Sequence, residues 1–466
     1  PDATLTSGGK VSLTAEDTSQ ITAIIAAVAI GVGAGAGGLG VAIGGAVAEN
    51  IISTVTTAQI LRSSVFYTVS SDLTLQATTN QVINALVLAG SMAVAVGDGG
   101  AVGASGAAAR NSITGQTTAS VDGGVTGATI GSETVPVASI TIKALDTSLI
   151  NAVTGAASIA ASFGPNVGVA IGIGVALAWN RIDNAVDAAV VNAVVTGSGP
   201  FNMAADEAAQ IKAWTAAASL SVAVGLVAVG VSGAGAQATN IILTKVNAHV
   251  DGGSLESAGD ITIKATNDAA IEAKVLAVAA AVAGGAAGVG VALGASVARN
   301  FIGWEPGSTG NPTFTSSDAS SVTPVTVVKG DTVQVVSGAR TGDIYKYVAA
   351  SPLTSTDLSV LEYGDTGQWQ LVGKDDRAQV RAYISAASKV SADGQLTLTA
   401  DATQTIDALV VAGAVALTGG GAAVGVSGAG VYAENRIATD VQAFLDGDDP
   451  LSTAVETTIV DVGSIK

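Results

Sequence analysis

The chain has 466 residues, of which 12% are charged, 3% are aromatic and 59 are Gly, a composition unlike that of an ordinary globular core. Its formal net charge of -18 offers no general attraction for nucleic acid or anionic headgroups, so we expect no nucleic-acid partner and disfavour a membrane partner. The absence of Cys excludes thiolate catalysis, thiolate metal sites and disulfide bonds, and it fits a bacterial extracellular protein.

Internal repeats organise the chain. Each repeat begins with a short alternating segment, of which ITIKALD at residues 140–146 is typical, and continues into a long run of Ala, Gly and Val. Every run ends in Ala-x-Asn, and successive Asn residues lie 61, 69, 60, 60 and 135 residues apart. The recurring residues are Asn50, Asn111, Asn180, Asn240, Asn300 and Asn435. The unit is therefore about 60 residues long, with one insertion of roughly 75 residues after the fifth Asn.

The spacing predicts three regions. Repeats one to five begin in 1–303, a small β-rich module is inserted over 304–375, and residues 376–466 complete repeat five and add repeat six. The last residues, VDVGSIK, return to the phase at which a new repeat would start. We therefore expect the chain to be a segment of a longer repeating protein.

A bundle of membrane helices is the main alternative to strands, because each apolar run is long enough to cross a bilayer as a helix. The runs are dense in Gly, however, and they lack the Trp and Tyr belts and the Lys and Arg clusters that orient membrane helices. Counted back from each Asn, small residues recur at every second position. That is the side-chain period of a strand, so the pattern favours strands.

The residues that flank each Asn are variable and often charged, as Glu49, Arg110 and Arg299 are. These side chains are expected to point outward, so Ala, Asn and Ile of the motif point inward. A period of two at fixed spacing predicts an all-β fold, a parallel β-solenoid of six repeats. Inward Ala and Gly would let facing sheets approach closer than the usual ~10 Å, which gives a thin, dry interior. Each repeat could form one wide coil or several narrower ones.

The succession GVGVALGASVARNFI, VRAYISAASKV and GQLTLTA resembles the repeats of very large secreted bacterial filamentous adhesins. These include the leukotoxin-type filamentous adhesins and the haemagglutinin-like exoproteins. The resemblance extends over all six repeats. It implies an extracellular or cell-surface fibre used in attachment or in building a biofilm matrix, and it implies no catalytic residues.

The recurring Asn residues are interpreted as a structural ladder, since inward amides on adjacent coils can hydrogen-bond to one another. Ligand coordination by their oxygens is the alternative. The single His249 has no nucleophile or orienting partner marked in the sequence, so we interpret it as a solvated strand residue. The turn FLDGDDP offers a weak calcium site in Asp446, Asp448 and Asp449, for which a solvated acidic turn is the competing interpretation. No other cofactor or metal is expected.

The insert contains KGDTVQVV, GDIYKYVAASP and WQLV, and this run resembles small chitin- or cellulose-binding modules. The match departs in the long loop TSTDLSVLEYGDTG. The resemblance implies carbohydrate binding, because sugar rings stack on exposed aromatic side chains. The aromatic residues available for that contact are Tyr345, Tyr347, Tyr363 and Trp369. Alternatively, a module of this size needs the same residues as its core.

The sequence thus predicts a structural segment of a secreted or cell-surface bacterial fibre or adhesin, and no enzyme. A stiff β-solenoid rod would serve attachment or an extracellular matrix, and its open coil ends would permit end-to-end polymerisation. The expected partners are neighbouring repeats or copies of the same protein, with surface polysaccharide as a further one. A membrane-embedded or pore-forming toxin segment is the alternative function.

Overall fold

The computed structural model describes residues 3–305, 312–319, 323–336, 343–355, 357–365, 367–374, 377–387, 389–446 and 459–465. The chain divides into two compact units, a larger one of Pro1–Ile302 with Gln379–Lys466 and a smaller one of Gly303–Ala378, close to the predicted 304–375 insert. Across the described residues the sole helical element is the short 3-10 turn η1 (Gly124–Thr126). The all-β class expected from the sequence is therefore confirmed. None of the described segments forms a helix with the length and apolar character needed to span a membrane.

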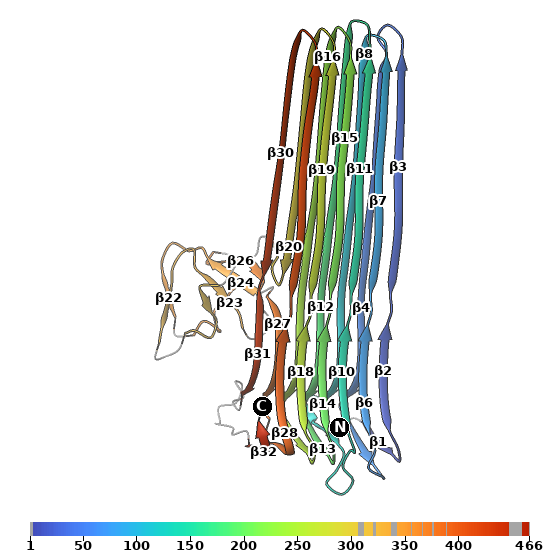
Figure 1. Ribbon diagram of the computed structural model, residues 1–466. Coiled ribbons are helices and arrows are strands. Elements are labelled where there is room, and N and C mark those ends of the chain that lie inside the picture. Colours follow the sequence, from blue (N-terminus) through green and yellow to red (C-terminus); the bar gives the residue numbers. More distant parts are fainter. Residues whose placement is uncertain are drawn as a thin grey trace. The chain divides into compact units, whose positions relative to one another are not determined.

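Three parallel sheets make up the larger unit (Figure 1). Sheet B consists of β3 (Gln20–Ala34), β7 (Val82–Val96), β11 (Leu149–Phe163), β15 (Gln210–Val224), β19 (Ala270–Gly284) and β29 (Thr405–Gly419). Sheet C consists of β4 (Leu39–Leu61), β8 (Gly99–Asp122), β12 (Val167–Val191), β16 (Val227–Asp251), β20 (Ala287–Ile302), β30 (Ala422–Ile437), β27 (Ala378–Ser385) and β31 (Thr439–Asp446).

Sheet A contains two rows of short strands that are joined through β28 (Lys389–Ala402), which also pairs with β32 (Ile459–Ile465). The first row is β1 (Ala3–Ser7), β5 (Ser63–Tyr67), β9 (Ala128–Ile130), β13 (Ala193–Gly197) and β17 (Ser254–Ser257). The second row is β2 (Val11–Asp17), β6 (Leu73–Thr79), β10 (Ile140–Asp146), β14 (Phe201–Glu207) and β18 (Ile261–Asn267).

Each long strand pairs in parallel with the equivalent strand of the next repeat. In sheet B, β11 pairs along its whole length with β15, from Leu149 opposite Gln210 to Phe163 opposite Val224. In sheet C, β12 and β16 pair over 25 residues in the same way. One repeat therefore supplies one strand to sheet B and one to sheet C, and equivalent residues of successive repeats lie side by side.

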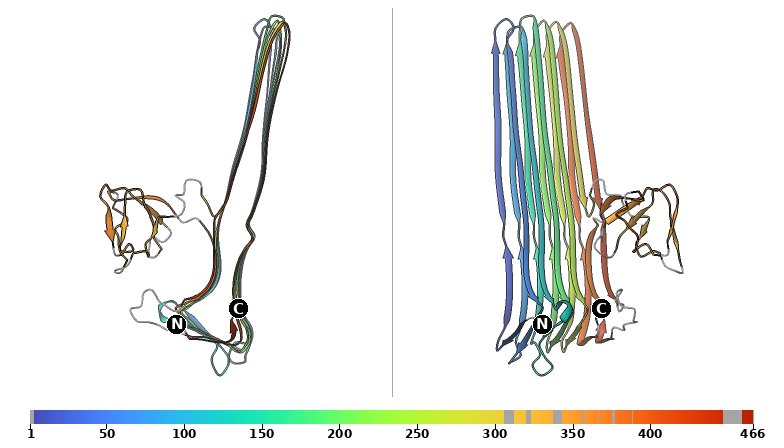
Figure 2. Two further views of the ribbon diagram at one scale, coloured as in Figure 1. Left: turned by 60° about the vertical axis from the view of Figure 1, so that its left-hand side comes forward. Right: turned by 180° about the vertical axis from the view of Figure 1, so that it is seen from behind.

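The interior narrows from sheet A toward the turns that connect sheets B and C. Beside sheet A the buried residues are large, including Leu73, Ile142 and Phe201. Farther along the long strands they are mostly Ala, with some Ile and Val, and nearest the turns the buried hydrophobic cluster consists of Ala alone. Figure 2 shows the result, with sheets B and C as two close layers that separate where sheet A begins. Side-chain size in the sequence thus sets the distance between the layers.

At Gly174 and Gly294 the two long sheets approach so closely that an added Cβ atom would meet facing backbone. A Cβ atom on Gly174 of β12 would lie 2.5 Å from the carbonyl oxygen of Ala218 on β15, and one on Gly294 would lie 2.6 Å from that of Gly413. Both Gly residues are six positions before the Asn of their repeat. Backbone therefore packs against backbone here, which gives the thin interior expected from the inward small residues.

The smaller unit interrupts one long strand of sheet C. β20 ends with Ile302 opposite Ile242, and β27 resumes with Gln379 opposite Lys245. Two residues therefore have to bridge the positions opposite 243 and 244, and Gly303 with Ala378 supplies them. A deletion that keeps the register removes 304–377, rather than ending at the expected boundary of 375.

Within the smaller unit, four strands form one sheet and two form another. The first is β21 (Phe314–Thr315), β23 (Thr332–Gln334), β24 (Asp343–Tyr347) and β26 (Trp369–Lys374). The second is the antiparallel pair β22 (Val325–Val327) and β25 (Leu353–Ser355). Its core is built around aromatic rings, in contrast to the Ala and Gly of the larger unit.

Replacing Gly174 by Ala is expected to lower the free energy of unfolding by about 1–3 kcal/mol, because the added methyl group has to push the facing backbone away. Gly235→Ala, on the adjacent strand β16, is the matched control, since no atom lies within 4 Å of a Cβ placed there. Thermal and denaturant unfolding of the two variants would measure the difference. Equal stability of both would show that the sheets are not in backbone contact.

Candidate functional site

The six recurring Asn side chains form one continuous row across sheet C. Each Nδ2 donates a hydrogen bond of 2.8 Å to Oδ1 of the next Asn, in all five steps from Asn50 to Asn435. The four middle members are fully buried, whereas Asn435 lies exposed on the terminal strand β30. In-register pairing of sheet C brings them together, because each Asn is directly opposite the next. The row thereby satisfies amide groups within an otherwise apolar interior.

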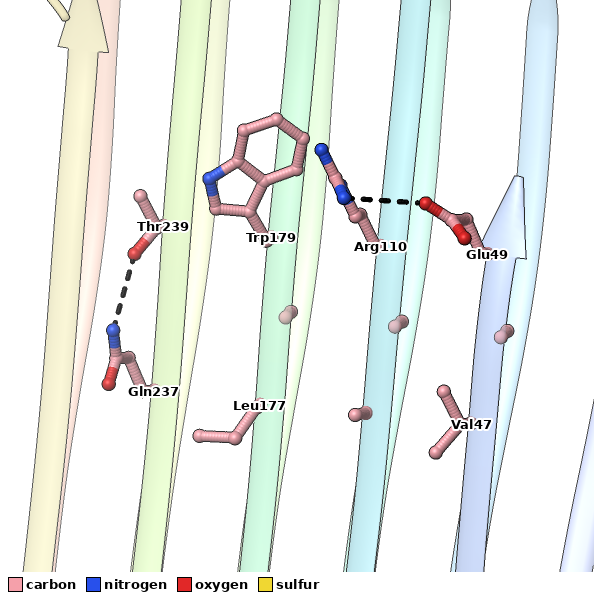
Figure 3. Close-up of a pocket in the computed structure, with 11 residues that line it drawn as sticks. Val47, Glu49, Arg110, Leu177, Trp179, Gln237 and Thr239 are labelled. Atoms are coloured by element: carbon pink, nitrogen blue, oxygen red, sulfur yellow. Dashed lines mark hydrogen bonds and ion pairs between the residues drawn. The ribbon is translucent and has the colours of Figure 1, made fainter. Parts of the chain in front are cut away.

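On the outer face of sheet C, the residues that precede these Asn form a second row, which we call the outer belt. Its members are Glu49, Arg110, Trp179, Thr239, Arg299 and Glu434. Glu49 forms an ion pair of 3.4 Å with Arg110, and the guanidinium of Arg110 lies 4.8 Å from the centre of the Trp179 ring (Figure 3). A shallow groove beside these residues has an apolar wall that includes Val47 and Leu177.

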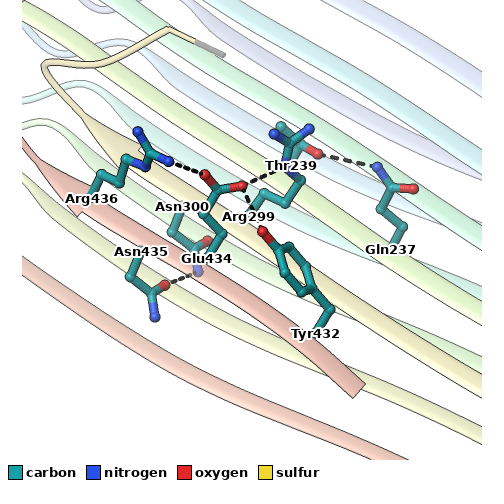
Figure 4. A network of polar contacts seen from close by, with 8 residues as sticks. All are labelled: Gln237, Thr239, Arg299, Asn300, Tyr432, Glu434, Asn435 and Arg436. Atoms are coloured by element: carbon teal, nitrogen blue, oxygen red, sulfur yellow. Dashed lines mark hydrogen bonds and ion pairs between the residues drawn. The ribbon is translucent and has the colours of Figure 1, made fainter. Parts of the chain in front are cut away.

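The other half of the outer belt is a charged network (Figure 4). Arg299 contacts Oε2 of Glu434 at 3.1 Å, and Arg436 contacts Oε1 at 3.0 Å. The Tyr432 hydroxyl donates to the same carboxylate at 3.3 Å. Desolvation acts to raise the pKa of Glu434, but the hydrogen bonds and positive charges of Arg299, Tyr432 and Arg436 together outweigh it, so the pKa lies below its usual value. The belt is therefore locally neutralised and held by polar contacts.

Thr239 is an outer-belt residue that solvent hardly reaches. It is 7% exposed, because it pairs with Trp179 on one side and Arg299 on the other. Gln237, two residues earlier, donates to the Thr239 hydroxyl at 3.4 Å and is itself exposed. The outer face thus combines covered and open positions along a single strand.

Two acidic side chains meet inside the larger unit, at the end of the short strands of sheet A. Asp146 of β10 is directly opposite Glu207 of β14, and both are buried. The backbone N–H and hydroxyl of Ser148 donate to Asp146 Oδ1 at 2.9 and 2.6 Å. Among the described residues, neither carboxylate oxygen of Glu207 has a hydrogen-bond partner.

Burial dominates the titration of this pair. It raises the pKa of Asp146 to about 6, although the hydrogen bonds from Ser148 act in the opposite direction. Burial, and then the neighbouring charge of Asp146, raise the pKa of Glu207 well above its usual value. The backbone of Ala209 and the side chain of Asn184 lower it only in part, because neither makes a full hydrogen bond to the carboxylate. The interior therefore favours the neutral acid at Glu207.

His249 is not the solvated residue expected from the sequence. Its ring stacks on Tyr383, with centres 4.8 Å apart and planes 10° from parallel, and Tyr383 stacks in turn on Phe444. His249 Nδ1 also lies 3.3 Å from a carboxylate oxygen of Asp187. The difference arises because the in-register strands β16 and β27 place the two rings side by side, which the sequence positions 249 and 383 do not reveal.

The aromatic residues predicted to contact carbohydrate are buried, which contradicts that role. Each of Tyr345, Tyr347, Tyr363 and Trp369 is at most 5% exposed. The Trp369 ring packs 4.9 Å from the ring centres of Tyr347 and Tyr363, and Tyr345 packs 5.0 Å from Tyr363. These rings form the core of the small unit, so no ring face is open for a sugar.

Of the weak calcium candidates, Asp446 ends β31 and its carbonyl oxygen accepts a hydrogen bond from the Ala386 N–H. Asp448 and Asp449 lie outside the described residues. In the part of the chain that is described, no group of three or more His, Cys, Asp or Glu side chains could hold a metal ion.

Comparison with known proteins found no match at any level. No family model matches the chain, and neither a curated protein nor a solved structure matches it.

Two features were absent from the sequence prediction. Asp146 and Glu207 are the last residues of the alternating segments ITIKALD and FNMAADE. Alternation that starts from the inward Ile140 and Phe201 makes both carboxyl groups point inward, so the sequence contained the signal for this pair. The aliphatic residues between the Ala and Gly positions could likewise have been assigned to the outer face.

Replacing Asn240 by Asp is expected to destabilise the protein by about 3–5 kcal/mol at pH 7, because it places an unpaired charge in the buried row and removes the donor to Asn300. Gln237→Glu makes the same amide-to-carboxylate change at an exposed position of the same strand and should be nearly neutral. Thermal unfolding at pH 7 and pH 4 would compare them. A similar loss in both variants would refute the inward facing of the row.

The buried acid pair predicts a pH dependence of stability. A folded-state pKa of about 6 for Asp146 means that its contribution is fully present below the unfolded value near 3.8 and is lost as the pH rises through 6. That loss is on the order of 2–3 kcal/mol. The raised pKa of Glu207 lowers stability at high pH in the same way, and its charge adds to the cost of ionising Asp146. Glu207→Gln removes this carboxyl group, so it should raise the unfolding midpoint at pH 8 and leave it unchanged below pH 4. The exposed Glu133→Gln is the control, and a stabilisation that does not vary with pH would contradict this account.

Proposed function

We propose that this chain is a structural segment of a secreted or cell-surface bacterial fibre. In this proposal the six repeats form a stiff β-solenoid rod that serves attachment or an extracellular matrix, and that extends by end-to-end stacking. The observation that carries it is the direction of the Asn row. All five hydrogen bonds run the same way, so the row ends in an amide oxygen at Asn50 and an amide nitrogen at Asn435.

The two ends of the row are complementary, because an amide nitrogen at one end can donate to an amide oxygen at the other. The strands that carry them, β4 and β30, are the two terminal members of the main path of sheet C, as β3 and β29 are in sheet B. A further repeat, or a second copy, could therefore continue both sheets in parallel register. Such a contact joins two different surfaces head to tail and does not close, so it generates a filament.

The chemistry of the chain supports a mechanical role. Pairing over 15 residues per strand in sheet B and up to 25 in sheet C gives a dense backbone network between repeats. Stability in such an array comes from nearest-neighbour contacts, so added repeats lengthen the rod without a new core. The absence of Cys fits an extracellular location without disulfide bonds.

Stacking can be tested at the β29 edge. Ala412 faces the interior and pairs with the buried Ala277, whereas the neighbouring Val411 faces outward. A Lys at 412 would place a charge in the stacking surface, as natural sheets do to prevent edge association. Concentrated parent chain should form linear assemblies in sedimentation velocity and negative-stain images, and Ala412→Lys should abolish them.

Val411→Lys adds the same charge to the same strand on its outer side, so it should leave the linear assemblies intact. Circular dichroism of both variants would establish that each is folded. A parent chain that stays monomeric at high concentration, or equal assembly of the two variants, would rule out edge stacking.

A further inference from the structure

The part of sheets B and C between the outer belt and the connecting turns, which we call the blade, is almost free of charge. It comprises residues 26–47, 86–109, 153–178, 214–238, 276–298 and 409–433. Asp98 is the one charged residue in these segments, although the chain has 19 Lys and Arg and 37 Asp and Glu. Asp98 lies in a connecting turn, where it accepts hydrogen bonds from Asn166.

Both outer faces of the blade expose large aliphatic side chains. On sheet B these include Val28 and Ile159, and on sheet C they include Ile43 and Ile173. Ile159 and Ile173 belong to central strands, yet they are 42% and 45% exposed. Because inward positions are restricted to small residues by the close approach of the sheets, the large aliphatic residues can only point outward. The exposed apolar area therefore covers two opposite faces, far beyond the single patch that is usual on a soluble protein.

Polar and aromatic residues border the blade at the same height on both faces. Gly174 of β12 lies against Ala218 of β15. Six residues from each of them, in the direction of sheet A, are Asn180 on sheet C and Lys212 on sheet B, so these two positions lie at about the same height. Trp179 adjoins the first of these positions on sheet C. On sheet B, Trp214 adjoins the second, and the Lys274 ammonium group lies 4.6 Å from its ring centre. Trp beside a cation is the residue pair that membrane proteins place at the level of the headgroups.

The height of the blade matches a bilayer. Ten residues separate Trp214 from Val224 at the end of β15, and ten separate Val169 from Trp179 on β12. At a rise of about 3.3 Å per residue, each corresponds to roughly 33 Å. The hydrocarbon core of a bilayer is about 30 Å thick.

Many polar groups inside the blade are paired without water, as a place in hydrocarbon requires. In the part of the chain that is described, the hydroxyl groups of Ser105, Thr154, Thr215 and Ser221 are the exceptions, since they are buried without a hydrogen-bond partner. Backbone groups of the central strands pair within their sheets. Buried hydroxyl groups donate to carbonyl oxygens of the facing sheet, as Ser158 does to Gly103 at 2.8 Å and Ser219 does to Gly172 at 2.9 Å. These hydrogen bonds connect the two sheets, and the hydroxyl groups that form them point away from the outer faces.

We infer that the blade inserts into the hydrocarbon core of a lipid bilayer, with the outer belt at the headgroup level. A second copy packed against one face would leave the opposite apolar face uncovered, whereas lipid covers both faces and accounts for the common height of the two borders. The net charge of -18 disfavours a membrane partner, but all charged residues except Asp98 lie outside the blade. The inference rests on the proposed stacking in one respect, since neighbouring repeats would cover the backbone edges of β3, β4, β29 and β30.

Co-flotation of the full chain with neutral phosphatidylcholine vesicles tests this inference. The parent should float with the vesicles, and the double variant Ile159→Arg/Ile173→Arg should bind at least tenfold less, because it places a charge on each outer face of the blade. Val194→Arg is the matched control, since Val194 is 44% exposed on β13 of sheet A, outside the blade. A parent that does not float, or equal loss in the control, would overturn the inference.

A labelled Cys distinguishes lipid from a second copy, and the chain has no other Cys to interfere. A polarity-sensitive dye on Ala157→Cys, on the outer face of β11, should shift to the blue with vesicles and be quenched by spin labels on the acyl chains. The same dye on Val194→Cys should respond to neither. A blue shift at 157 that grows with protein concentration without lipid would instead assign the blade to self-association. Linear assembly is measured separately by sedimentation, so a failure of edge stacking can be distinguished from a failure of lipid insertion.

Discussion

Parallel in-register pairing is the constraint on which the rest of this structure depends. Because each residue lies beside its equivalent in the next repeat, every inward position becomes a column of similar side chains. A column is stable only if its side chain can pack against itself. Asn can, since its amide both donates and accepts, and the five uniform contacts of 2.8 Å are the result. Ala and Gly can as well, because they need almost no space. A carboxylate cannot, because it only accepts.

The acid pair shows the cost of breaking that rule. The column that contains Asp146 and Glu207 holds Thr79 before them and Asn267 after them. Each of those neighbours can donate a hydrogen bond, whereas two adjacent carboxyl groups cannot both be ionised in the interior. Their raised pKa values record this conflict. At this step Ser148 supplies two donors to Asp146, which offsets part of the conflict.

Much of the larger unit could be predicted from the sequence, because a period of two repeated in phase specifies both the strands and their facing. The inward position of Asn240 follows from Ala238 and Ile242 alone. Contacts across the insertion could not be predicted in the same way, since His249 and Tyr383 stack within one column but are separated in the chain by unrelated sequence. In the small unit, Trp369 and Tyr347 serve as core or as binding surface with the same sequence pattern. Only their packing distinguishes the two.

The thin interior determines where the apolar mass of the chain can go. In an ordinary two-layer β fold, large aliphatic residues fill a space of about 10 Å between the sheets and supply most of the stability. Here the approach of Gly174 to the Ala218 carbonyl leaves no such space, so residues such as Ile173 are placed on the outside. In water their exposure contributes little to folding and favours association. Contact with hydrocarbon removes the same surfaces from water, so the feature that makes the blade thin also makes lipid a stabilising environment for it.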